Sequence, residues 1–241
     1  MKLEYCPAPF PHIKATELIS PDIYKTMRFP ELEARAMGRI GYDLYRGEPG
    51  WAEIVAQPGW KEFYAEVSSR EFVGRILGLF KNDIIRFGGG IDPDRFTLEE
   101  FNEKRQEVKS PRLASDADPN ALFTRFDFQA IDETYNSYAH VDWARRVVGG
   151  VLFMSSAEEE KIVGGEFALF RDAEFQNDRR CHKAVLAAKY PVAHNTGYFF
   201  LNFNGGFHGP LPMRQCIGMR KWIYYSISSR RDVWVPARVP A

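Results

Sequence analysis

The residues best suited to chemistry are an imidazole and a carboxylate in the segment SYAHVDW, where His140 and Asp142 are separated by one residue. Side chains at positions i and i+2 of an extended strand point to the same face, so both groups can reach one metal ion. Such a short pair also arises by chance, and alone it is a weak signal. It predicts a metal site only together with a third ligand.

A third ligand is available far downstream at His208, close to the end of the aromatic segment YFFLNFNGGFHG. Two histidines and one carboxylate on one face of an octahedral ion leave three positions open, which is the facial triad of oxygen-activating iron enzymes. Zinc can take the same three ligands with water as the fourth, so the ligand types leave both metals open. We expect His140, Asp142 and His208 to hold one metal ion.

The half of the chain that carries these residues has the pattern of a β-rich fold. Six short segments are rich in aromatic and β-branched residues and are separated by Gly, Asn or Asp: 123–132, 148–156, 164–172, 182–190, 196–205 and 221–229. Strands at this spacing without intervening helices predict an antiparallel sandwich or jelly roll.

The first 110 residues are predicted to be mainly helical. Ser20 precedes a proline at a first helical position, and Ser68 with Glu71 resembles a capping box before apolar residues at four-residue spacing. Residues 97–108 are predicted to form a further, charged helix and residues 84–87 a short strand, while residues 110–121 have the composition of a loop. The expected fold class is therefore α+β, with helices packed against one sheet of a β-sandwich.

The order of several sequence segments resembles that of a known enzyme family. The ordered segments HVDW, GGEFALFR, FLNF, FHGP and RKWIYYS resemble the core of the Fe(II)/2-oxoglutarate-dependent oxygenases, in the prolyl-hydroxylase-like branch. The resemblance covers about residues 8–28 and 122–230. It implies a single oxygenase domain over residues 1–241, in which residues 1–110 support a double-stranded β-helix (jelly-roll) core at 122–235.

The resemblance also implies the cofactors. Fe(II) would be bound by His140, Asp142 and His208, with 2-oxoglutarate and O2 as co-substrates and succinate as a product. The distal carboxylate of 2-oxoglutarate would pair with Arg220, whose guanidinium offers two parallel donors. Many relatives place Ser or Thr two positions after this arginine, whereas this chain has Trp222. A hydroxyl from Tyr138 or Tyr224 is the expected substitute.

Composition excludes several partner classes. Lys and Arg together number 32, as do Asp and Glu, so the formal net charge is zero and the chain lacks the basic excess typical of nucleic-acid binding. The sequence contains no apolar run long enough to span a bilayer, and its N-terminus lacks a signal-peptide pattern. Three cysteines without CxxC spacing favour a reducing compartment, so a cytoplasmic location is expected.

The leading hypothesis is a dioxygenase that hydroxylates a small molecule. Hydroxylation of a protein or peptide side chain is the nearest alternative. A zinc-dependent hydrolase could use the same three ligands, and a non-enzymatic jelly-roll binding module would need none of them.

Overall fold

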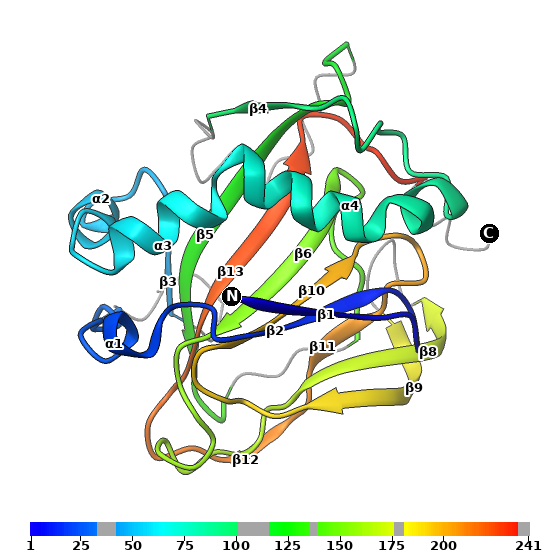
Figure 1. Ribbon diagram of the computed structural model, residues 1–241. Helices are drawn as coiled ribbons and strands as arrows, with labels where there is room; N and C mark the ends of the chain where they lie inside the picture. The colour runs from blue at the N-terminus through cyan, green and yellow to red at the C-terminus, as the bar shows by residue number, and fades with distance from the viewer. Residues whose placement is uncertain (33–41, 101–115, 135–138, 176–180, 236–241) are drawn as a thin grey trace.

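The computed structural model describes residues 1–32, 42–100, 116–134, 139–175 and 181–235, and its strands form one large sheet and two small ones (Figure 1). The major sheet has the strand order β1 (Lys2–Cys6), β2 (His12–Thr16), β10 (Thr196–Leu201), β6 (Arg146–Phe153), β13 (Arg220–Ser229), β5 (Ala121–Ile131) and β3 (Tyr42–Leu44). These neighbours pair antiparallel, whereas β4 (Thr97–Glu99) pairs parallel with β5.

The smaller sheets complete the strand inventory of the described residues. The three-stranded sheet has the order β11 (His208–Pro210), β8 (Phe167–Phe175) and β9 (Cys181–Tyr190), and the two-stranded sheet pairs β12 (Met213–Gln215) with β7 (Val163–Gly164). Both contain antiparallel pairs only.

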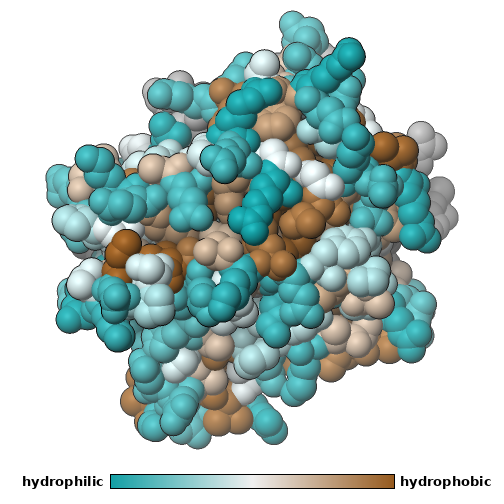
Figure 2. Space-filling view, viewed as in Figure 1, coloured by the Kyte–Doolittle hydropathy of each residue, from teal (hydrophilic) through white to brown (hydrophobic). Residues whose placement is uncertain are grey.

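Two longer helices, α3 (Trp60–Val67) and α4 (Arg70–Arg86), cover one face of the major sheet (Figure 1). The helix α4 is capped at its N-terminus by Ser69, whose hydroxyl accepts a hydrogen bond from the backbone N–H of Phe72. The short helices α1 (Pro21–Tyr24) and α2 (Trp51–Val55) lie nearer the edge that carries β3. The outer surface on this side is mostly hydrophilic, with smaller hydrophobic patches (Figure 2).

Alternation along β13 places its side chains in two different apolar clusters. Ile223, Tyr225 and Ile227 pack with the helices, whereas Trp222 and Tyr224 point to the opposite face of the sheet. On that opposite face they meet Phe167 and other side chains of the three-stranded sheet. The central strands are therefore enclosed by helices on one side and by a second sheet on the other.

The predicted mixture of antiparallel strands and helices is confirmed, with corrections in detail. Each of the six predicted strand segments contains a strand. Residues 84–87, predicted as a strand, instead continue α4 to Arg86, because Ile84 falls on the buried stripe of that helix. The start of α4 lies at Ser69 and not at Ser68, and Thr97–Glu99 is a strand; the rest of the predicted helix over 97–108 lies mostly outside the described residues.

The N-terminal half contributes more strand than expected. Four strands from the first 110 residues, β1 to β4, join the major sheet, although helices form its apolar cover. In the described part of the chain, no helix is both long and apolar enough to cross a membrane.

Two leucines of α4 test this packing. Leu77 is fully buried under the helix and Leu79 is 38% exposed on its outer side. We expect Leu77→Ala to lower the free energy of unfolding by about 2–5 kcal/mol, since it leaves a cavity in the core. Leu79→Ala is the matched control and should cost less than about 1 kcal/mol. Urea unfolding followed by circular dichroism measures both, and equal losses would contradict the assigned face.

Candidate metal centre

The site is assembled by a backbone contact between two segments far apart in the sequence. The backbone N–H of His140 donates to the carbonyl of His208 at 3.0 Å, and the N–H of His208 donates back to the carbonyl of His140 at 2.9 Å. This isolated antiparallel bridge brings the two imidazole rings to 4.6 Å between centroids. One histidine follows β5 and the other opens β11, so the bridge joins the major sheet to the three-stranded sheet.

The three predicted ligands converge. One ligand atom from each of His140, Asp142 and His208 lies within 4.8 Å of the others. The Nε2 atom of His208 is 3.9 Å from Oδ2 of Asp142. His208 is 5% and Asp142 8% exposed, while His140 is partly exposed. Two imidazoles and one carboxylate at this separation are a donor set that suits a divalent transition metal.

His208 is held in the form that a metal requires. Its Nδ1–H donates to the carbonyl of Gly206 at 2.9 Å, which leaves the lone pair of Nε2 on the side of Asp142. Burial lowers the pKa of His208 to about 3, and the neighbouring His140 acts in the same direction. The imidazole is therefore neutral at neutral pH and can act as a ligand.

Asp142 is held as a carboxylate by two side chains. Its Oδ1 atom accepts from Nη1 of Arg146 at 2.5 Å, and its Oδ2 atom accepts from the hydroxyl of Tyr224 at 3.1 Å. Burial raises the pKa of Asp142, but the positive charge of Arg146 and its hydrogen bond, together with His208 and His140, outweigh burial and hold that pKa well below its usual range. Burial also raises the pKa of Tyr224, so its hydroxyl stays protonated and can donate.

The turn that carries Asp142 is clamped by Asn202, which follows β10. The side-chain oxygen of Asn202 accepts from the backbone N–H of Asp142 at 2.7 Å. Its amide nitrogen donates to the carbonyl of Trp143 at 2.8 Å and to that of Arg146 at 3.3 Å. One buried side chain thus fixes the backbone of a ligand and of the residue that pairs with it.

Sequence reasoning missed Asn202 and Arg146. A signal for Asn202 was present, because a polar residue within the aromatic segment YFFLNF has to find hydrogen-bond partners once it is buried. Arg146 lies four residues after Asp142, but nothing in its spacing distinguishes it from Arg145.

Arg220 lies inside the molecule at the start of β13, only 3% exposed. Its guanidinium carbon is 4.8 Å from the ring centroid of Phe153 and 4.6 Å from that of Trp222. Trp222, the departure from the family pattern, therefore packs directly on this guanidinium. Arg220 shares the inward face of β13 with Tyr224, which contacts Asp142.

The predicted Gly164–Gly165–Glu166 turn holds Arg220 in place. Nε of Arg220 donates to the carbonyl of Gly165 at 2.8 Å. Gly164 and Gly165 have φ values of 89° and 72°, and a Cβ atom on Gly164 would lie 2.2 Å from the carbonyl oxygen of Pro212. Glycine is required here both by conformation and by space.

The two tyrosine hydroxyls that were expected to assist Arg220 are those of Tyr224 and Tyr138. The hydroxyl of Tyr224 donates to Asp142, at the metal-ligand end of the site. Tyr138, expected to bind the cofactor, lies outside the described residues.

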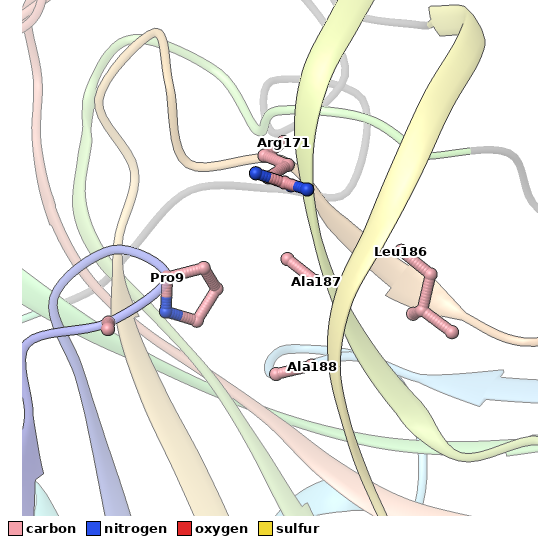
Figure 3. A pocket seen from close by; sticks show the side chains of 6 residues that line it. Pro9, Arg171, Leu186, Ala187 and Ala188 are labelled. Atoms are coloured by element: carbon pink, nitrogen blue, oxygen red, sulfur yellow. The ribbon is translucent and has the colours of Figure 1, made fainter.

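A separate depression lies between the β1–β2 connection and the outer strands β8 and β9 (Figure 3). It is lined by Ala8, Pro9, Arg171, Leu186, Ala187 and Ala188. Since it contains neither an imidazole nor a carboxylate, it does not provide the chemistry of the triad.

No model of a known protein family matches the chain, and no curated protein sequence matches it. Solved structures that match include a prolyl-4-hydroxylase from Pseudomonas putida, with 14% identity over 90% of this chain and 91% of that one and a TM-score of 0.43. A prolyl hydroxylase from Trichoplax adhaerens, in complex with a hypoxia-inducible-factor peptide, matches with 9% identity over 90% and 83% and a TM-score of 0.41. A Phytophthora capsici prolyl 4-hydroxylase matches with 10% identity over 78% and 48% and a TM-score of 0.39. All three matched proteins are prolyl hydroxylases.

Removal of the Asn202 clamp should loosen the site. We expect Asn202→Ala to cost roughly 2–3 kcal/mol of unfolding free energy, because it leaves the buried N–H of Asp142 without its acceptor. Asn204→Ala, on an exposed residue of the same segment, should change stability by no more than about 0.5 kcal/mol. Thermal or urea unfolding in the presence of a chelator gives both values. If the two variants are equally stable, Asn202 does not hold the turn.

Proposed function

We propose that this protein is an Fe(II)- and 2-oxoglutarate-dependent dioxygenase that hydroxylates its substrate. The observation that carries the proposal is the convergence of His140, Asp142 and His208, two of them buried, with ligand atoms within 4.8 Å of one another. Such a donor set leaves metal positions open for a chelating co-substrate and for O2. We further propose that the two facing sheets form a jelly-roll core within a single oxygenase domain.

Each residue has a defined part in this proposal. His140, Asp142 and His208 would hold the iron, which when loaded with 2-oxoglutarate and O2 supplies the oxidising power for hydroxylation, with release of succinate and CO2. His208 contributes a neutral imidazole whose orientation is set by Gly206. Asp142 contributes a negative charge that burial alone would disfavour and that Arg146 stabilises.

Arg220 would bind the distal carboxylate of 2-oxoglutarate. The residue is a buried permanent cation on the same sheet face as Tyr224, and its guanidinium is stacked by Phe153 and Trp222. A guanidinium held in this way is pre-organised for bidentate binding of a carboxylate.

For the substrate we propose a small molecule, as the sequence suggested. The sequence supports this choice, since it contains neither a repeat of a peptide-binding kind nor a basic tract. A side chain of a protein or peptide is the alternative. Succinate release measured with a small-molecule panel and with a peptide panel distinguishes the two classes.

Anaerobic titration of Fe(II) into the apoprotein with 2-oxoglutarate tests the proposal. We expect a weak visible charge-transfer band in the wild type and none in His140→Ala. In Arg220→Ala the dissociation constant of 2-oxoglutarate should rise roughly 10- to 100-fold, because a charge-assisted contact is lost. Arg214→Ala, on an exposed arginine of the preceding strand, is the matched control and should bind normally.

The same titration separates the rival classes. If zinc binds tightly and no band forms with iron, the site belongs to a zinc hydrolase. If neither metal binds, the chain is a non-enzymatic binding module. Either result excludes the oxygenase.

A further inference from the structure

The two oxygens of Asp142 have different surroundings. Oδ1 is paired with Nη1 of Arg146 at 2.5 Å, whereas Oδ2 lies 3.9 Å from Nε2 of His208 and accepts from the hydroxyl of Tyr224 at 3.1 Å. The oxygen on the side of His208 is thus Oδ2. Of the two, it is the atom suited to bind a metal shared with the histidines.

The position of Arg146 is fixed by contacts of its own side chain and backbone. Its guanidinium carbon lies 4.9 Å from the ring centroid of Tyr224, and its side chain is only 12% exposed. Its backbone N–H donates to the carbonyl of Trp143 at 2.9 Å, and its carbonyl accepts from Asn202. Arg146 is the first residue of β6, so the backbone of the residue that pairs with Oδ1 belongs to the major sheet.

A carboxylate ligand has two possible binding modes, through one oxygen or through both. Three protein ligands at an octahedral ion leave three open positions. A chelating 2-oxoglutarate would need two of these positions and O2 the third. A second oxygen from Asp142 would take one of the three, and the co-substrates could then no longer bind together.

We infer that Arg146 is a positioning residue that restricts Asp142 to one metal-binding oxygen and so reserves the open positions for the co-substrates. The inference rests on the proposed function. It assigns Arg146 a role beyond the common one of an outer residue that only strengthens metal binding, because the property it controls is the binding of 2-oxoglutarate to the metal-loaded protein.

The test measures two affinities in R146Q, which removes the charge. Fe(II) affinity is measured anaerobically by competition with a chromogenic chelator, and 2-oxoglutarate affinity by the charge-transfer band of the iron-loaded protein. We expect the dissociation constant of 2-oxoglutarate to rise about tenfold or more, which is the order of the loss in activity when a residue that orients a metal ligand is replaced. The dissociation constant of Fe(II) should change by a clearly smaller factor.

Conservative and control variants separate this role from a structural one. R146K keeps a cation beside Oδ1 and should recover most of the 2-oxoglutarate affinity lost in R146Q. R145Q removes the neighbouring buried arginine, whose charge acts on Asp232, and should leave both affinities near those of the wild type. If R146Q does not fold, R146M fills a similar volume without a buried polar end and should give the same result.

The outcomes are distinct from those that test the proposed function. If the wild type forms no charge-transfer band, the proposed function itself fails. If the wild type forms the band and R146Q binds 2-oxoglutarate as tightly as the wild type, only the inference about Arg146 is overturned. It is also overturned if R146Q loses Fe(II) affinity by the same factor as 2-oxoglutarate affinity, since Arg146 then merely supports the metal.

Discussion

The site depends on the pair of backbone hydrogen bonds between His140 and His208. Main-chain bonds fix the separation of the two residues whatever their side chains are, so the imidazoles meet because two strand ends meet. The bridge connects the segment after β5 to the edge strand β11 of the three-stranded sheet. Without it, the two sheets would still pack through Phe167 and its aromatic neighbours, but the ligands would have no fixed spacing.

The interior around this bridge contains charges that a β-sandwich core would ordinarily exclude. Asp142 and Arg146 form one ion pair, and Arg125 and Asp127 on β5 form a second that is also buried. Buried pairs of this kind add little net stability, because desolvation offsets much of their attraction. The two pairs meet at Tyr224, whose ring centroid lies 5.2 Å from the guanidinium carbon of Arg125 and 4.9 Å from that of Arg146. Apolar packing on both faces of the sheet supplies the stability, against α3 and α4 on one side and around Phe167 on the other.

Much of this arrangement could be predicted from the sequence, for reasons that differ between residues. The pair His140 and Asp142 could be proposed from its local spacing, although only His140 forms a strand-like bridge and Asp142 lies outside any strand. His208 could be proposed because the order of the surrounding segments resembles a known pattern, whereas the carboxylate-binding role of Arg220 stays a prediction. Asn202 and Arg146 were missed, since their importance lies in contacts that form only in the folded chain, such as that between Asn202 and Asp142. The segment 84–87 was misjudged because β-branched residues favour a strand locally, whereas the preceding helix continued and buried Ile84.

The pairing of β2 with β10 constrains the order in which the chain can fold while it is being synthesised. Residues 12–16 leave the ribosome long before their partner strand at residues 196–201 has been synthesised. The N-terminal hairpin therefore cannot pair with β10 until residues 196–201 are available. The bridge between His140 and His208 likewise requires residue 208. Topologies dominated by such distant pairings fold slowly and expose unpaired strand edges in the meantime. A site that needs His140, Asp142 and His208 accordingly cannot assemble before residue 208 has been synthesised.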